Sequence, residues 1–288
     1  DSLKSMADYL EYIDYHTWDN LWARGHHFGD WLNLDGSSPE DCSNGTDKDL
    51  IATAYFIYSS AIYIKACELC GEDAGKYPAM REDFIKAFRN KYMKDGRITD
   101  EYATQTACVL ACHFGISDNI AETAKQLNKL VTACGHLKTG FVGTPYLLHA
   151  LSDNGYTKTA YDILLREEYP SWLFSVKMGA TTIWERWNSV LPDGSISGTG
   201  MNSLNHYTYG SIVQWMYENM CGLTLCENGF KTFYVKPEVS ERFDYVDMQY
   251  DSPKGIICVK WKKVGNGYSL YVKVPFDCEA IVKVPWKE

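Results

Sequence analysis

The spacing of hydrophobic residues divides the sequence into a long helical part and a shorter part in which apolar and polar residues alternate. From the start to about residue 225, apolar positions recur at the spacing of amphipathic helices. Several segments, such as LIATAYFIYSSAIYIKA, are apolar nearly all round, which predicts helices buried on both sides, as in the inner layer of a two-layered ring. The predicted helices cover roughly residues 2–18, 48–70, 79–93, 102–113, 117–133, 143–154, 157–167 and 205–221.

After Gly229 the pattern changes to short runs with a period of two residues, separated by Gly, Pro, Asn and Asp. The runs are FKTFYVK, YVDMQYD, GIICVKWK, GYSLYVKV and EAIVKVP. Gly265-Asn266-Gly267 is typical of the turn of a β-hairpin. We therefore predict two domains: a mainly α domain over residues 1–225 and a small antiparallel β-sandwich over residues 226–288.

Charge and composition exclude some classes of partner. The net charge of -9, without any run of Lys and Arg, argues against a nucleic-acid partner. The most apolar stretch, from Leu50 to Ala66, is broken by Thr, Ser, Tyr and Lys, which favours a buried helix over a membrane span. The 9 Trp and 21 Tyr favour a carbohydrate ligand only weakly, because aromatic side chains also fill protein cores.

The cysteines and histidines do not predict a metal site. Cys67 and Cys70 are spaced like metal ligands, but they lie in an Ala- and Ile-rich helical stretch without a second pair nearby. His26 and His27 are adjacent in sequence, and neighbouring residues seldom face one ion. No phosphate-binding loop, GxSxG elbow or His-Glu-x-x-His pattern occurs. We expect free thiols, with no metal and no cofactor.

A carboxylate with the features of a general acid or base occurs in the segment TTIWERWNS. Glu185 lies between Trp184 and Trp187 and beside Arg186, in a loop that precedes a predicted helix. Two indoles remove water from a carboxylate, and such an environment suits proton transfer near neutral pH. The alternative is an Arg–Glu surface pair beside packed tryptophans, and the pattern leaves both interpretations open.

Two further loops contain side chains that suit sugar hydroxyls. In MNSLNHYTYG, Asn205 and His206 precede a helix that we expect to begin near residue 207, where they either bind a ligand or cap the helix. In HHFGDWLNLD, Asp30 and Trp31 can bind two hydroxyls and stack on a sugar ring. The alternative for Asp30 is an Asx-type turn ahead of a core tryptophan.

Several of these segments resemble one known family over essentially the whole chain. The run TGFVGTPYLLHALSDNGYTKTAYDILLREEYPSWLFSVKMGATTIWERW, followed by MNSLNHYTYGSIVQWMYENMCGL, resembles the bacterial α-L-rhamnosidases of the inverting (α/α)6-barrel class. The segments FGDWLNLDG, GFKTFYVKPEV and VPFDCEAIVKVP are similar to that family as well. The resemblance implies part of an (α/α)6 barrel followed by the β-sandwich.

The resemblance also implies roles for single residues. Glu185 matches the general base of the family, and His206 matches a histidine of the rhamnose subsite. Asp30 and Trp31 match sugar-contacting positions, while Trp184 and Trp187 shape the pocket around the base. The implied partner is a rhamnose-containing glycoside or oligosaccharide.

The sequence departs from the family in lacking its general acid. Nothing like the expected acidic motif, Asp-x-x-Arg-x-Glu-Arg, occurs in the 288 residues, and a full ring needs twelve helices. The first residues predict a helix already under way, without a visible signal peptide. We therefore expect a fragment that is inactive by itself. A glycosidase of the same fold for another sugar, and a non-catalytic carbohydrate-binding fragment, remain alternatives, and compartment and oligomeric state stay open.

Overall fold

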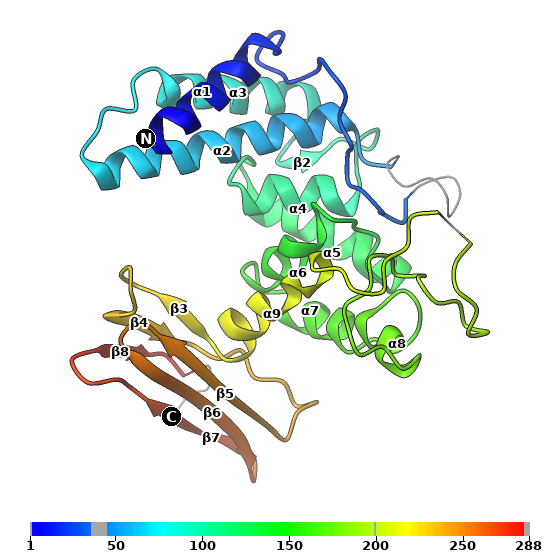
Figure 1. The fold of residues 1–288 in the computed structure, drawn as a ribbon, viewed down its shortest axis with the longest axis vertical. Helices are drawn as coiled ribbons and strands as arrows, with labels where there is room; N and C mark the ends of the chain where they lie inside the picture. Colours follow the sequence, from blue (N-terminus) through cyan, green and yellow to red (C-terminus); the bar gives the residue numbers. More distant parts are fainter. Residues whose placement is uncertain (1, 36–44, 199, 285–288) are drawn as a thin grey trace. The chain divides into compact units, whose positions relative to one another are not determined.

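The computed structural model describes residues 2–35, 45–198 and 200–284, and the contacts of the chain divide it into two compact units (Figure 1). The first unit is Asp1–Tyr209 and the second is Gly210–Glu288. The predicted succession of a helical part and a β part is confirmed. The two units meet between Tyr209 and Gly210, upstream of residue 225. The domain boundary at residue 225 stays a prediction.

The first unit is built from consecutive pairs of helices. α2 packs on α3, α4 on α5 and α6 on α7, while α2 contacts α4 and α4 contacts α6. Two layers result, with α2, α4 and α6 in one of them. The helices are α1 (Ser2–Tyr15), α2 (Lys48–Cys70), α3 (Tyr77–Tyr92), α4 (Gln105–His113), α5 (Ile120–Cys134), α6 (Thr144–Ser152), α7 (Thr157–Leu164) and α8 (Trp172–Lys177), and the strands β1 (Met93–Lys94) and β2 (Arg97–Ile98) form a short hairpin.

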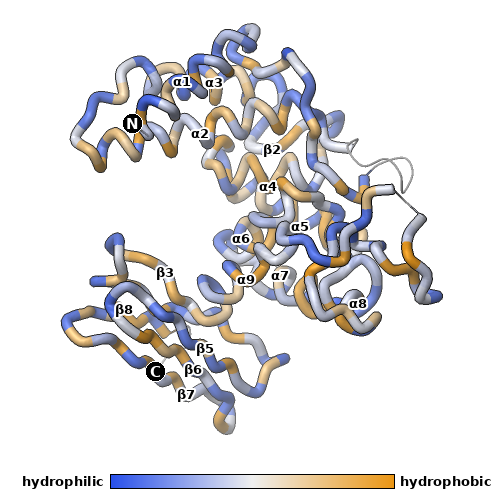
Figure 2. Tube along the Cα trace, in the orientation of Figure 1, coloured by the Kyte–Doolittle hydropathy of each residue, from blue (hydrophilic) through white to orange (hydrophobic). Residues whose placement is uncertain are grey.

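The two layers differ in how their helices are buried. α4 buries every residue from Gln105 to Cys112, and hydrophobic residues are spread along α2 (Figure 2). In α5, by contrast, Ala124, Leu127 and Val131 form a single apolar stripe at helical spacing. Helices in contact on several sides need apolar residues all round, whereas an outer helix needs them on one face only.

Side-chain caps determine where these helices begin. Asp47 accepts a hydrogen bond from the backbone N–H of Leu50 at 2.7 Å and so begins α2. Thr104 does the same for α4 through the N–H of Ala107. α2 ends at Gly71, whose φ of 71° is a left-handed conformation that suits glycine.

α2 is long and apolar enough to cross a membrane by length and composition. However, 56% of its most apolar window is buried inside the protein. This burial is what the core helix of a folded domain shows, as the interrupted apolar run of Leu50 to Ala66 predicts.

The helix predicted over residues 205–221 is shorter and less regular than expected. A 3-10 turn covers Thr208–Ser211, α9 covers Ile212–Trp215, and a π-helix covers Met216–Met220. The backbone before it is not available for a helix, because His206 donates its N–H to another loop, at Ile183. The sequence also gave no sign of α8, whose six residues are too few to show a helical period.

The second unit contains two three-stranded sheets, ordered β3-β4-β8 and β5-β6-β7. The strands are β3 (Leu223–Leu225), β4 (Thr232–Val235), β5 (Tyr245–Ser252), β6 (Gly255–Val264), β7 (Gly267–Lys273) and β8 (Glu279–Val282). The predicted hairpin is confirmed, since Val264 pairs with Gly267 around a two-residue turn. Two features differ from the prediction: β3 was not expected, and β4 and β8 pair in parallel within an otherwise antiparallel arrangement.

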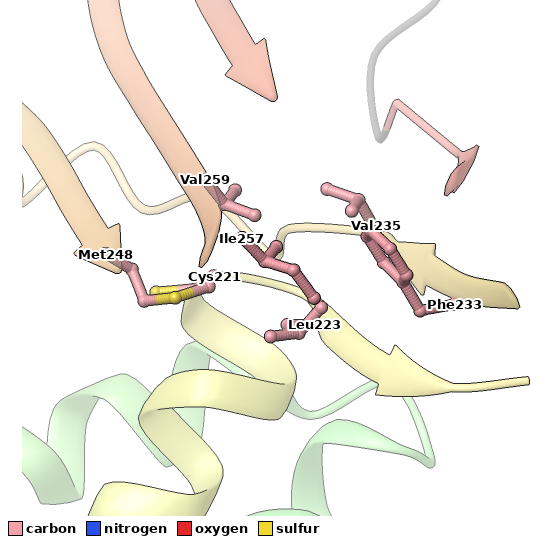
Figure 3. Close-up of a cluster of buried hydrophobic side chains, with 7 residues drawn as sticks. All are labelled: Cys221, Leu223, Phe233, Val235, Met248, Ile257 and Val259. Carbon is pink, nitrogen blue, oxygen red and sulfur yellow. The ribbon is translucent and has the colours of Figure 1, made fainter. Parts of the chain in front are cut away.

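The core of the second unit is formed by side chains from both sheets. Phe233 and Val235 on β4 are fully buried, as are Ile257 and Val259 on β6 (Figure 3). Cys221, Leu223 and Met248 complete this cluster. Burying each large aliphatic or aromatic side chain stabilises a fold by roughly 1.5–3 kcal/mol, so a few such residues account for much of the stability of a small domain.

We expect Ile257→Val to destabilise this unit by about 0.5–1.5 kcal/mol, because it removes a methyl group from a fully buried site. Hydrogen exchange of the β6 amides, followed by mass spectrometry, should become roughly two- to tenfold faster. Ile256→Val is the matched control, since the neighbouring side chain is 37% exposed. Equal effects of the two substitutions would contradict the assignment of this core.

Candidate active site

The WERW segment lies in a loop that pairs with the segment containing His206. The backbone N–H of Glu185 donates to the carbonyl of Ser203 at 2.9 Å, and the N–H of His206 donates to the carbonyl of Ile183 at 2.8 Å. The two segments therefore run antiparallel. This pairing joins the segments that carry Glu185 and His206, the two residues with the strongest chemical features in the sequence.

The Glu185 side chain is almost buried and held in one orientation. It is 9% exposed, and its Oε2 accepts the backbone N–H of Ser203 at 2.7 Å. No partner for Oε1 occurs among the residues that the structure describes. The Nε–H of the neighbouring Arg186 does not bond to this carboxylate, because it donates to the carbonyl oxygen of Met201 at 2.7 Å. A carboxylate with one fixed oxygen and one remaining oxygen can accept a proton from a bound water.

The His206 ring is half-buried and stacked between aromatic rings. Its ring centroid lies 5.1 Å from that of Phe141, with an angle of 21° between the ring planes. The corresponding values for Tyr207 are 5.1 Å and 16°. The N–H of Thr208 approaches its Nδ1 at 3.4 Å, an arrangement that leaves Nε2 as the N–H donor of a neutral ring. The ring is thus positioned by stacking, with a polar edge that suits a hydroxyl group.

The two tryptophans beside Glu185 are buried. Trp187 stacks on Tyr209 with ring centroids 4.0 Å apart, and it lies edge-on to Trp172 with centroids 5.1 Å apart. Its Nε1–H donates to the carbonyl oxygen of Thr139 at 3.4 Å. Trp184 and Trp187 also line a cavity of about 290 Å³. The described residues that line this cavity do not include Glu185 or His206. The indoles therefore border a different space from the one that the Glu185 carboxylate can reach.

Asp30 is fully buried and its carboxylate is occupied by the chain itself. Oδ2 accepts the hydroxyl of Thr106 at 2.5 Å and the N–H of Gly140 at 2.8 Å, while Oδ1 accepts the N–H groups of Val142 and Gly143 at 2.9 and 3.2 Å. Burial raises the pKa of this carboxyl, and the four hydrogen bonds oppose that rise. With no exposed surface, Asp30 cannot touch a sugar in this arrangement, so the geometry favours a structural role.

Trp31 and Asn205 lie nearer to the surface. Trp31 is half-buried, its ring lies edge-on to Phe28 at 5.8 Å, and its carbonyl accepts the N–H of Phe141 at 2.9 Å. Asn205 is exposed, and its backbone forms a tight turn with the hydroxyl of Ser203. Both can reach a ligand, unlike Asp30.

Three residues of this region were not singled out from the sequence. Phe141 supports the His206 ring, Tyr209 supports Trp187, and Thr139 accepts the indole N–H of Trp187. Burial raises the pKa of the Tyr209 phenol well above its usual value, and its hydroxyl donates to the carbonyl of Leu32 at 3.3 Å. The only signal for Phe141 was an aromatic residue among glycines in TGFVG.

Within residues 2–35, 45–198 and 200–284, no group of three or more His, Cys, Asp or Glu side chains is arranged to hold a metal ion. His27, one of the two adjacent histidines, has an aromatic neighbour: its ring lies edge-on to that of Trp22, with ring centroids 5.0 Å apart. Burial lowers the pKa of this imidazole. Its surroundings are therefore aromatic rather than metal-binding.

Two family models match the chain in succession. Residues 1–220 match the bacterial alpha-L-rhamnosidase 6 hairpin glycosidase domain, and residues 222–288 match the bacterial alpha-L-rhamnosidase C-terminal domain. Among curated proteins, the chain is 37% identical over 289 aligned positions to an alpha-L-rhamnosidase of Alteromonas sp. (strain LOR), covering 97% of this chain and 31% of that protein.

Solved structures are similar over nearly the whole chain. The Streptomyces avermitilis alpha-L-rhamnosidase complexed with L-rhamnose superimposes with a TM-score of 0.89 at 33% identity, covering 98% of this chain and 27% of that one. The native Aspergillus terreus enzyme gives a TM-score of 0.93 at 29% identity, covering 99% and 34%. The chain thus spans about a third or less of the length of these relatives.

We expect Gly140→Ala to destabilise the first unit by more than about 1 kcal/mol. A Cβ at this position would lie 2.2 Å from the carbonyl oxygen of Trp31 and 2.7 Å from that of Asp30. Gly198→Ala is the control, because a Cβ there has nothing within 4 Å and should change stability by less than about 0.5 kcal/mol. Denaturant unfolding of both variants tests this, and equal midpoints would show that the loops do not approach so closely.

Proposed function

The chain belongs to the bacterial α-L-rhamnosidases with a six-hairpin glycosidase domain, and from this premise we propose a specific role in catalysis. We propose that it supplies the general base, Glu185, to a longer protein that hydrolyses terminal α-L-rhamnosyl residues with inversion. The general acid comes from residues outside this chain. Homologues with this activity support glycoside hydrolysis as the reaction class.

One observation carries the proposal: the segments of Glu185 and His206, separate in sequence, are joined by backbone hydrogen bonds from Glu185 to Ser203 and from His206 to Ile183. Inversion needs a base that activates water on one face of the sugar and an acid that protonates the leaving oxygen on the other, about 6.5–9.5 Å away. Glu185 is suited to the first task, since Ser203 fixes one oxygen and the other has no partner among the described residues.

The remaining site residues have supporting roles in this proposal. The polar edge of His206 binds a ring hydroxyl, and Asn205 and Trp31 contact the sugar from exposed or half-exposed positions. Trp184 and Trp187 flank the base in the sequence and are both buried. Asp30 does not contact the sugar in this proposal, because both of its carboxylate oxygens already accept hydrogen bonds from the chain.

We expect Glu185→Gln, in the longer protein that contains this chain, to lower kcat for 4-nitrophenyl α-L-rhamnoside by about 10²–10⁴-fold. The amide keeps the shape of the side chain but cannot accept a proton from water. Glu168→Gln is the control, because that side chain is 75% exposed and pairs with Arg166 at 3.7 Å, outside the WERW loop. A nearly unchanged rate for Glu185→Gln would refute the base assignment, and aryl glycosides of other sugars would reveal a different specificity.

The chain of 288 residues by itself should hydrolyse the same substrate at least about 10²-fold more slowly than the longer protein, because it lacks the acid. Near-UV circular dichroism of the purified chain checks that it is folded. Comparable turnover numbers for the two forms would mean that the acid lies within these residues.

A further inference from the structure

One buried carboxylate orients a whole turn of the first unit. The two oxygens of Asp30 accept the backbone N–H groups of Gly140, Val142 and Gly143, and also the hydroxyl of Thr106 on α4. Hydrogen bonds are directional, so four of them to one side chain hold their donors in defined positions. The path of residues 139–143 is therefore fixed by Asp30 rather than by a helix or sheet.

The same turn is held from its other side as well. The N–H of Phe141, which lies between those bound by Asp30, donates to the carbonyl of Trp31 at 2.9 Å. Gly140 lies so close to this loop that no side chain fits there. Asp30 and Trp31 together leave the turn little freedom to shift.

This turn carries two groups that touch the candidate active site. The ring of Phe141 stacks on His206 at 5.1 Å, and the carbonyl of Thr139 accepts the indole N–H of Trp187 at 3.4 Å. The hydrogen bonds of the Asp30 side chain among the described residues go to Thr106 and the 140–143 backbone, and not to His206 or Trp187. A path of direct contacts nevertheless leads from the carboxylate, through the turn, to His206 and Trp187.

We propose that Asp30 is a positioning residue, which fixes the 139–143 turn so that Phe141 holds the His206 ring in place for the sugar. The claim about the sugar rests on the proposed function, whereas the claim about the histidine does not. It replaces the sugar-binding role that the sequence suggested for Asp30 with one exerted through the protein.

Thr106 offers a cleaner test than Asp30, because removing the carboxylate leaves buried N–H groups without partners. Thr106→Val keeps the shape of the side chain and removes one donor to Asp30. Thr106→Ser restores the hydroxyl. Thr123→Val is the matched control: Thr123 is equally buried and its hydroxyl donates to the carbonyl of Gly96, not to Asp30.

The first measurement is the NMR signal of the His206 ring in the longer protein with labelled histidines, assigned with His206→Gln. Phe141→Leu removes the stacked ring and should shift this signal. We expect Thr106→Val to shift it in the same direction, and Thr106→Ser and Thr123→Val to leave it in place. A shift in Phe141→Leu without one in Thr106→Val would overturn the proposal.

The second measurement is the inhibition constant of L-rhamnose. Thr106→Val and Phe141→Leu should each weaken inhibition by about tenfold, the effect of losing roughly one good interaction. The double variant should be little worse than either single one, since both act on one contact. Additive effects, or a loss in Thr123→Val of the same size, would mean a general loss of stability and would sink the idea. Failure of the proposed function would instead show as wild-type protein that L-rhamnose does not inhibit, which leaves the NMR result valid.

Discussion

The pairing of a buried carboxyl group with four hydrogen-bond donors holds together the loops of the first unit. A carboxylate removed from water costs several kcal/mol unless donors replace the lost hydration. Asp30 obtains its donors from α4 and from the turn ahead of α6, so three segments that are distant in sequence must meet around it. The requirement is mutual, because the buried N–H groups of the turn also need an acceptor.

The helices provide the frame on which this meeting is possible. α4 and α6 contact each other, and the donors to Asp30 come from Thr106 in the first turn of α4 and from the residues just before α6. In many enzymes, rigid helices or strands position the loops that carry the functional residues. A continuous row of aromatic rings connects these loops. Trp172 contacts Trp187, Trp187 stacks on Tyr209, and Tyr209 contacts Phe141.

Much of the architecture followed from the sequence because it depends on local pattern. The apolar helix of α2, the single stripe of α5 and the turn after Val264 are each encoded within a few neighbouring residues. The parallel pair of β4 and β8 was not predictable in this way. Its register joins residues far apart in sequence, and a period of two residues is the same for either strand direction.

The candidate site shows the same limit more sharply. Glu185 and His206 stood out because their chemistry is unusual for their local surroundings. The role of Asp30 depends on Gly140 and Val142, more than one hundred positions away, and nothing in GDW distinguishes a carboxylate that binds sugar from one that binds a turn. Phe141 was overlooked for the same reason, since its importance lies in the His206 ring that it touches.

The paired segments around Glu185 are joined by a loop that pairs with itself, since the N–H of Ser197 donates to the carbonyl of Ser189 at 3.1 Å. Val190 and Ile196 form an isolated bridge, and residues 192–196 between the paired segments are exposed. Exposed loop tips accept insertions more readily than paired backbone does. Residues inserted at 192–196 would therefore leave in place the backbone hydrogen bonds that join the segments of Glu185 and His206.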